Sequence, residues 1–415
     1  MSVGTVGSED LRNEMVDRLA ADHRGKGLTL RPEVEAALRT VPRELYTPGV
    51  PLKEAYENTA VVTKRRGEES ISSVSAPFLI AEMLGQAANA LGDLRGRHAL
   101  EIGSGGYNAS LLRELVGPSG SVTTVDIDPE VTDRAASCLA AAGYNDVTVV
   151  CADAEHPIEA GRRYDLIIVT AGAWDIPPAW RDQLTDSGVL VVPLRMFGTT
   201  RSWALRHSGD RLISHSRRLC GFVPVQGDGA SAIRYLDIAD GVHLRLDEGE
   251  QIAPACVEGI LARPRQEAWA GVSLPPRTAL PDLDMWLATR LREESVTLSA
   301  QEEAVASGIV APAWRFGTPA TLHDGTFAYR SELRWTDRRF DLGAYAHGPA
   351  AAAAAGRMVE HMRAWVDAGC PAPALEVVPA RTPDGDLPDG AVLDKRHSRL
   401  ILTFNATSIE KKGTP

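Results

Sequence analysis

Residues 100–128 read LEIGSGGYNASLLRELVGPSGSVTTVDID. The segment runs from an apolar stretch at Glu101 through a glycine-rich turn and a helical stretch to a second apolar stretch that ends at Asp126. A strand, a tight turn, a helix and a second strand in this order predict half of a nucleoside-binding unit. Glycine lets the backbone pass close to a ligand because it carries no Cβ. An acidic side chain after the second strand can accept hydrogen bonds from both ribose hydroxyls.

Two classes of cofactor use such a turn. A dinucleotide fingerprint would place a third glycine at position 108, where this chain has Asn108. That glycine serves close packing beneath a pyrophosphate, and S-adenosylmethionine has no pyrophosphate. Asp153 supplies a further acidic residue after the next apolar stretch, TVVC. We therefore expect a site for S-adenosyl-L-methionine, with S-adenosyl-L-homocysteine as product and no metal.

In this site we expect Asp126 to bind the ribose, Asp153 the adenine amino group and Glu101 to approach the methionine end. The expected cofactor-binding residues are Glu101, Gly103, Ser104, Gly105, Tyr107, Asp126, Ile127, Asp153, Ala154 and Thr170. Each acidic residue also has a structural interpretation that the sequence leaves open. Asp126 and Asp128 are placed to cap the helix after Pro129. Asp153 is placed to cap the following turn, and Glu101 to pair with a neighbouring donor.

The wider pattern predicts three parts. Apolar strand patterns alternate with helical patterns up to residue 226, which is typical of a parallel sheet covered on both faces, and two antiparallel-looking strands close this region. We expect this α/β core, a Rossmann-like doubly wound sheet, over 96–228. A helical cap that carries the acceptor-binding segment is expected over 1–95. An accessory α+β domain, expected to recognise a peptide substrate, covers 229–415.

Shorter patterns lead to local expectations. Helical spacing is present at 11–21 and 34–40 in the cap, which also contains a polar stretch at 63–73. In the accessory domain, strand patterns occur at 242–246, 326–335 and 399–404, an alanine-rich helix is expected over 349–368, and an exposed turn over 382–398. Most tryptophans there are expected in the core, namely Trp269, Trp286, Trp314, Trp335 and Trp365.

Composition excludes several classes of partner. The net charge of −11 argues against a nucleic-acid-binding surface. No apolar run approaches the roughly 18 residues of a membrane helix, and the N-terminus lacks the basic flank and apolar run of a secretory signal. We expect a cytoplasmic protein with no membrane partner. The five cysteines are scattered without metal-ligand spacing, so we expect them to be buried apolar residues in a reducing compartment. The sequence carries no signal for the oligomeric state.

From Val41 to about Gln226 the chain resembles the protein-L-isoaspartate O-methyltransferase family. The shared blocks are VPRELYTP, AYEN, SVSAPFLIAEML, EIGSG, VDIDPE, AGYNDVTVVCAD and YDLIIVTAGAWDIPPAWRDQLTDSGVLVVPL. The resemblance implies a class I S-adenosylmethionine-dependent methyltransferase fold and a protein or peptide carboxyl O-methyltransferase activity. In that family a hydroxyl of the T-I-S-x-P segment lies beside the methyl-accepting carboxyl group. This implies catalytic roles for Ser73 and Ser75, although the same stretch is also placed to cap the helix near Pro77.

The chain departs from the family pattern in three places near the acceptor and again after residue 226. It has Ile71-Ser72-Ser73-Val74-Ser75 where the family usually has G-Q-T-I-S, Phe78 where histidine is common, and a glycine turn that is one residue shorter. The added C-terminal half is the largest departure. In these features the chain resembles a tailoring branch of the family, which modifies ribosomally made peptides such as lanthipeptides. One subgroup of that branch is of the FxLD type. The resemblance implies methylation of an aspartate in a constrained, modified precursor peptide, leading through a succinimide to isoaspartate.

The expected chemistry needs no general base, because a carboxylate is already ionised at neutral pH. Positioning is the main requirement, and hydroxyl donors can orient a carboxylate without protonating it. Three alternatives remain open from the sequence. The first is housekeeping methylation of isoaspartate in damaged proteins, the second a catalytically silent cofactor-binding scaffold, and the third a small-molecule O-methyltransferase.

Overall fold

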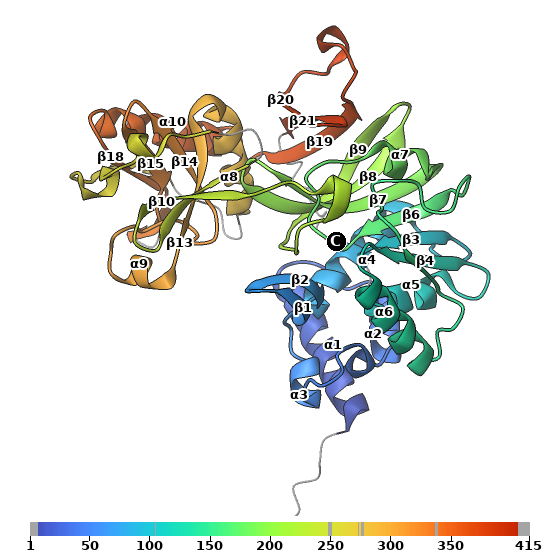
Figure 1. The fold of residues 1–415 in the computed structure, drawn as a ribbon. Helices are drawn as coiled ribbons and strands as arrows, with labels where there is room; N and C mark the ends of the chain where they lie inside the picture. Colours follow the sequence, from blue (N-terminus) through green and yellow to red (C-terminus); the bar gives the residue numbers. More distant parts are fainter. Residues whose placement is uncertain are drawn as a thin grey trace, which may run out of the picture.

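A computed structural model describes residues 7–103, 105–247, 251–272, 274, 278–336 and 339–405. Figure 1 shows the N-terminal cap in blue below a central sheet in green, with a second sheet unit in yellow and orange beside it. The last strands, in red, extend away from the second unit and lie beside the central sheet.

The cap combines helices with a β-hairpin. Its elements are α1 (Ser8–Gly25), α2 (Pro32–Thr40), the 3-10 helix η1 (Arg43–Tyr46), α3 (Leu52–Ala55), β1 (Val61–Arg66) and β2 (Glu69–Val74). The helices expected at 11–21 and 34–40 are confirmed. The polar stretch at 63–73 lies in the antiparallel hairpin of β1 and β2. Two strands can pair through their backbones even where both faces of the hairpin carry polar side chains. Such strands lack the alternation of apolar and polar residues, so the sequence pattern does not predict this hairpin.

The central sheet confirms the expected α/β core. Its first strands are β3 (His98–Ile102), β4 (Ser121–Asp126), β5 (Thr148–Cys151), β6 (Tyr164–Val169), β7 (Leu184–Met196), β8 (Thr199–Ser208) and β9 (Arg211–Leu219). Their order is β5-β4-β3-β6-β7-β8-β9, with parallel pairing from β5 to β7 and antiparallel pairing from β7 to β9. The associated helices are α4 (Pro77–Leu91), α5 (Tyr107–Val116), α6 (Pro129–Ala141) and α7 (Pro178–Asp182).

Apolar side chains bury both faces of this sheet. Alternate residues of a strand point to opposite faces, and here Ala99 and Ile168 belong to the cluster that includes α4, α5, α6 and the cap helices. Leu100 and Val169 belong to the cluster on the other face, which includes Trp180 of α7. All four strand residues are at most 1% exposed. Burial on both faces fixes the strand register and thereby the positions of the strand ends.

The strand order places a crevice at the carboxyl ends of the parallel strands. After β3 the chain moves outward to β4 and β5, and then returns to β6 on the other side of β3. Ligands of open α/β sheets bind where the order reverses in this way. Asp126 is the last residue of β4, and the turn at Gly103, Asp153 and Thr170 follow the ends of β3, β5 and β6 at the same edge.

A second, antiparallel sheet forms most of the C-terminal half. Within the described chain its order is β10-β11-β13-β14-β15-β18-β12. Its strands are β10 (Arg234–Ala239), β11 (Val242–Leu246), β12 (Gln266–Trp269), β13 (Ser295–Ala300), β14 (Thr318–His323), β15 (Thr326–Arg330) and β18 (Gly343–His347), and β16 (Arg334–Thr336) pairs with β17 (Arg339–Asp341). The helices are α8 (Leu280–Arg290), α9 (Glu302–Ala306) and α10 (Ala351–Asp367). The strands expected at 242–246 and within 326–335 and the alanine-rich helix are confirmed.

The last strands belong to the central sheet and not to this second unit. They are β19 (Ala372–Pro379), β20 (Ala391–Asp394) and β21 (Ser398–Asn405), and β19 pairs with the edge strand β9. The expected accessory domain 229–415 is therefore divided between two sheets. The expected exposed turn over 382–398 also needs correction, because it contains β20 and the buried residues Lys395 and Ser398. The edge of β9 can accept a further strand. The alternation of apolar residues in the sequence does not show that β19 is that strand.

Some side-chain expectations were wrong. Trp286 and Trp365 are buried, whereas Trp314 and Trp335 are 44% and 58% exposed. All five cysteines are free, but two of them, Cys151 and Cys256, are exposed. Among the described residues, none of the helices has the length and apolar character needed to cross a membrane. The same residues contain no cluster of histidine, cysteine and carboxylate side chains suited to a metal ion.

A buried ion cluster joins the two sheet units. Arg201 of β8 donates to Asp282 of α8 at 2.7 Å, and Arg217 of β9 also pairs with Asp282. The Arg201 and Asp282 side chains are 3% and 7% exposed. Because both charged groups have lost their hydration, each is stabilised by the opposite charge of the other.

We predict that Asp282→Ala lowers the free energy of unfolding by about 3–5 kcal/mol, since it leaves Arg201 buried without a carboxylate. Chemical unfolding followed by tryptophan fluorescence measures the change. Asp384→Ala is the control, because Asp384 pairs with Arg399 but is 89% exposed and should cost less than about 1 kcal/mol. Equal effects of the two substitutions would contradict a stabilising role for the buried cluster.

Candidate functional site

A cavity opens at the carboxyl ends of β3, β4, β5 and β6. It encloses about 690 Å³ of empty space, part of it open to solvent, which suits a small-molecule site. Of the residues expected from the sequence, it is lined by Ser73, Gly103, Gly105, Asp126, Ile127, Asp153, Ala154 and Thr170. A second, smaller cavity shares Ser73, Gly103, Gly105 and Thr170 with it. Glu101, Tyr107 and Ser75 line only the smaller cavity, and Ser104 lies outside the described residues.

The glycine turn is shaped by its contact with the end of β6. Gly103 has a φ of +97°, a conformation that L side chains rarely adopt. The Thr170 hydroxyl donates to the Gly103 carbonyl oxygen at 2.6 Å, and a Cβ on Gly103 would lie 2.8 Å from that hydroxyl oxygen. Glycine is therefore required at position 103. Thr170 holds the turn in place as well as lining the cavity.

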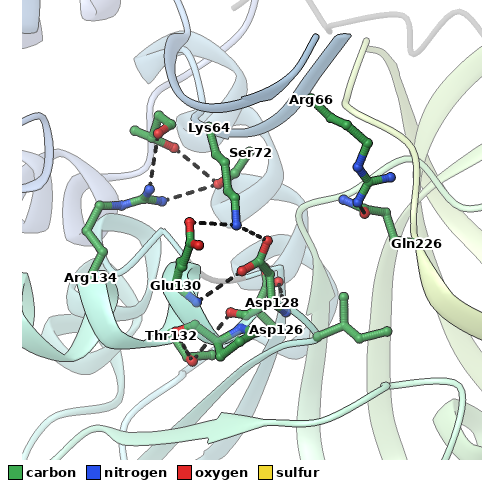
Figure 2. A network of polar contacts seen from close by, with 12 residues as sticks. Lys64, Arg66, Ser72, Asp126, Asp128, Glu130, Thr132, Arg134 and Gln226 are labelled. Carbon is green, nitrogen blue, oxygen red and sulfur yellow. Dashed lines mark hydrogen bonds and ion pairs between the residues drawn. The ribbon is translucent and has the colours of Figure 1, made fainter.

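The two aspartates after β4 have different roles. Asp128 caps α6 by accepting from the Glu130 amide at 3.0 Å, and it pairs with Lys64 at 2.6 Å, which lowers the pKa of the Asp128 carboxyl. Asp126 accepts from the Asp128 amide at 3.0 Å and lines the larger cavity. The capping interpretation is therefore correct for Asp128, while Asp126 borders the larger cavity. Figure 2 shows both aspartates below Lys64.

Asp153 supports two backbone segments at once. One carboxylate oxygen accepts from the Glu155 amide and the other from the Asp228 amide, both at 2.9 Å. The first contact is the turn-capping interpretation, and the second ties down the segment after β9. Gly227, with a φ of +75°, passes so close to Asp153 that a Cβ there would collide with the carboxylate. Each carboxylate oxygen still has a second lone pair, and Asp153 also lines the cavity.

Glu101 is a buried carboxyl group between two donors. Asn108 donates to one of its oxygens at 2.8 Å, and the Thr124 hydroxyl donates to the other at 2.6 Å. Burial raises the pKa of Glu101 to about 7, although both hydrogen bonds favour the charged form. The structural pairing expected for Glu101 is thus present. The residue is nevertheless part of the wall of the smaller cavity.

Ser73 and Ser75 come from the end of β2 and the residues that follow it. Ser73 borders both cavities, and Ser75 lines the smaller one together with Glu101. Among the described residues, neither serine hydroxyl makes a hydrogen bond, and the Phe78 amide in the first turn of α4 donates to the Asn58 side chain at 2.9 Å instead. Tyr107 lies in the same wall, where burial raises its pKa to about 12. The structure therefore assembles hydroxyl groups between a buried carboxyl group and the larger cavity.

The β1–β2 hairpin is tied to the site by cations. Lys64 pairs with Asp128 and with Glu130, and Arg134 of α6 donates to the Ser72 hydroxyl at 3.2 Å (Figure 2). At the far end Arg66 donates to the Gln226 side chain at 3.0 Å. These contacts hold β2, and with it Ser73, beside the cavity.

Sequence reasoning missed part of the wall. Trp180 lines the larger cavity and donates its indole N–H to the Ala154 carbonyl oxygen at 2.7 Å. Val225 and Gln226, which follow β9, close another side. Trp180 lies within a shared sequence block and Val225 lies near the end of the resembling region, but neither carries a motif that indicates a ligand. Only the fold brings them to the strand ends.

Comparisons with known proteins identify relatives of the part of the chain that contains both cavities. The family model for protein-L-isoaspartate(D-aspartate) O-methyltransferase (PCMT) matches residues 13–230. The chain is 37% identical over 187 residues to Protein-L-isoaspartate O-methyltransferase of Ignicoccus hospitalis, covering 45% of this chain and 82% of that protein. It is 34% identical over 233 residues to Protein-L-isoaspartate O-methyltransferase 2 of Archaeoglobus fulgidus, covering 55% and 98%. A Plasmodium falciparum chain solved with S-adenosyl-L-homocysteine aligns with a TM-score of 0.44 and 18% identity, covering 52% and 98%.

We predict that Glu101→Gln changes how stability depends on pH. The ordinary pKa of this carboxyl group is 4.5, and its pKa in the folded chain is about 7. Between these two pH values the carboxyl group is protonated in the folded chain and ionised in the unfolded chain. The unfolded chain then binds fewer protons, so wild-type stability falls as pH rises through this window. Relative to Glu101→Gln, the wild type should lose up to about 3 kcal/mol. Chemical unfolding of both proteins at several pH values measures this, and a constant difference would show that Glu101 has the same pKa in the folded and unfolded chain.

Proposed function

The chain belongs to the protein-L-isoaspartate(D-aspartate) O-methyltransferase family, and from that premise we propose that the carboxylate of an isoaspartyl residue in a peptide or protein is its methyl acceptor. It is a protein carboxyl O-methyltransferase that depends on S-adenosyl-L-methionine. The relatives named above support isoaspartate over the other acceptors that the sequence left open. A silent scaffold and a small-molecule methyltransferase have no support from these relatives.

The charge of the larger cavity is the observation that carries the cofactor assignment. Asp126, Asp153 and Glu155 line it, and none of its described lining residues is lysine or arginine. S-adenosyl-L-methionine is a nucleoside with a positively charged sulfur and an ammonium group, so acidic walls suit it. A phosphorylated nucleotide would bring further negative charge beside these carboxylates, and like charges placed together are costly. The residues present therefore fit the cofactor.

We assign the cofactor contacts as follows. Asp126 accepts from the ribose hydroxyls, Asp153 accepts from the adenine amino group, and Glu101 stabilises the ammonium of the methionine end. Binding of an ammonium near Glu101 would favour its ionised form, which burial alone disfavours. Ile127 and Trp180 supply apolar surface to the same cavity. When bound, the cofactor supplies an electrophilic methyl group on its sulfur.

We assign the acceptor carboxylate to the smaller cavity, where Ser73 and Ser75 orient it. Their hydroxyls donate hydrogen bonds and leave one carboxylate oxygen free to attack. Because the acceptor is already ionised at neutral pH, these residues act by position and need no general base. Ser73 borders both cavities, so it lies where acceptor and methyl group must meet.

A second acceptor class is favoured by one observation. Residues 231–405 lie outside the family match, and they build a second sheet unit and three further strands. Such an addition suits recognition of a particular peptide, for example a modified ribosomal precursor with a constrained ring. In that case the acceptor is an ordinary aspartate. Its methyl ester would lose methanol when the next backbone nitrogen attacks, giving a succinimide that hydrolyses to isoaspartate.

We predict that Asp126→Ala weakens binding of S-adenosyl-L-homocysteine more than tenfold, because the ribose hydroxyls lose a charged acceptor. Isothermal titration calorimetry measures the change. Glu130→Gln is the matched control, since Glu130 lies four residues away, is 78% exposed and faces Lys64. Its affinity should stay within twofold of the wild type. Unchanged affinity of Asp126→Ala would remove Asp126 from the cofactor site.

Methyl transfer to matched peptides tests the acceptor. Intact mass is measured for linear peptides that differ only in aspartate or isoaspartate, and for a macrocyclic aspartyl peptide. We expect the linear isoaspartyl peptide to gain a methyl group and its aspartyl counterpart to remain unmodified. Methylation of the macrocyclic aspartyl peptide alone, followed by loss of methanol, would contradict the isoaspartyl acceptor and establish the constrained-peptide class.

A further inference from the structure

We infer that the turn of residues 395–398, between β20 and β21, is a positioning element of the cofactor cavity. This inference rests on the proposed function, because it takes S-adenosyl-L-methionine as the ligand. The turn lies more than 160 residues beyond the end of the family match at residue 230. It contacts three segments that surround the cavity: Glu155, the loop after β6, and the strap, which is defined as residues 222–231 after β9.

Four consecutive side chains of the turn make these contacts. Lys395 lies over the Trp174 ring and donates to the Arg195 carbonyl oxygen at 3.2 Å. Arg396 donates to the Asp228 carbonyl oxygen at 2.7 Å. His397 pairs with Glu155 at 2.8 Å and donates its backbone amide to Asp175 at 2.6 Å. Ser398 is fully buried and donates to the same carboxylate, Asp175. The turn is thus fixed to the loops after β5 and β6.

The contact with His397 fixes a wall residue of the cavity. Glu155 lines the larger cavity and follows β5. One carboxylate oxygen faces the His397 ring, and the other lies so near Gly229 of the strap that a Cβ there would be 2.7 Å away. The Glu155 side chain is only 11% exposed. Its conformation is therefore set from both sides, by the turn and by the strap.

The contact with Arg396 holds the strap from outside. Val225 and Gln226 of the strap line the cavity, and the Asp228 amide donates inward to Asp153. The Asp228 carbonyl oxygen accepts from Arg396 on the other side. One residue of the strap is thereby held between a carboxylate assigned to adenine and a cation of the C-terminal strands. Loss of Arg396 would remove the contact that holds this residue from outside, while Arg66 and Asp153 still hold the strap at other points.

Pairing with the central sheet makes the turn a firm support. β21 pairs with β19 along eight positions, and β19 pairs with β9. Arg211 of β9 and Glu376 of β19 add an ion pair of 2.6 Å across that junction. A turn carried by strands is placed more exactly than a free loop. The C-terminal strands therefore place Arg396 and His397 relative to the same sheet that carries Asp126 and Asp153.

Calorimetric titration with S-adenosyl-L-homocysteine tests the inference on the full chain. We expect Arg396→Ala and His397→Ala each to weaken binding at least fivefold. His397→Gln keeps a hydrogen-bond donor near Glu155. It should therefore recover at least half of the affinity that His397→Ala loses. Arg399→Gln is the matched control, because Arg399 lies in the adjoining strand β21 but pairs with the exposed residues Asp384 and Asp394. Its affinity should remain within twofold of the wild type.

Kinetics separate positioning of the cofactor from a general loss of structure. The KM for S-adenosyl-L-methionine should rise in Arg396→Ala, while kcat and the KM for the peptide stay within twofold. Arg396 is exposed, so this variant retains the fold even if His397→Ala does not. The inference is overturned if Arg396→Ala and His397→Ala bind S-adenosyl-L-homocysteine with wild-type affinity while Asp126→Ala binds it more weakly. Failure of the wild type to bind S-adenosyl-L-homocysteine would instead overturn the cofactor assignment itself.

Discussion

The site depends on one electrostatic constraint, which is that acidic side chains gather at one edge of a buried parallel sheet. Parallel strands end together, so Asp126 after β4 and Asp153 after β5 lie in one cavity. Each accepts at least one backbone amide, which replaces part of the hydration lost on folding. Glu101 is more deeply buried, and its pKa of about 7 records the cost of charging it there. Such an edge favours a cationic nucleoside over a phosphorylated one.

Lysine, arginine and histidine side chains contact this acidic wall from behind and do not line the cavity. Lys64 faces Asp128, the His397 ring faces Glu155, and Arg396 faces a strap carbonyl oxygen. Each of these groups comes from a segment distant in sequence from its partner. The contacts that balance negative charge therefore also hold the hairpin and the C-terminal turn against the core. These contacts leave the lining of the larger cavity without lysine or arginine, so the lining stays acidic.

The sequence predicts the site where local backbone rules apply and misses it where long-range contacts decide. Gly103 and Asp126 were predictable, because a turn with positive φ and an acid after a strand leave local signals. Asp128 shows the limit, since only the structure separates the capping aspartate from the one in the cavity. The turn at 395–398 was expected to be exposed, because its partners, such as Glu155, lie more than 200 residues away. The exposed Trp314 likewise shows that apolar character alone does not place a side chain in a core.

The C-terminal half contains the turn at 395–398, which contacts the wall of the larger cavity, and the second sheet unit, which lines neither cavity. Strands β19 to β21 continue the central sheet, and the Arg201–Asp282–Arg217 cluster joins the second unit to β8 and β9. A unit fixed in this way stands at a set position beside the cavities, whereas a unit on a flexible linker would sample many positions. On the proposed assignment of the acceptor to Ser73 and Ser75, a fixed neighbour would restrict which peptide segments reach these serines. The cofactor contacts are common to both acceptor classes, so their difference must reside in this restriction on the peptide.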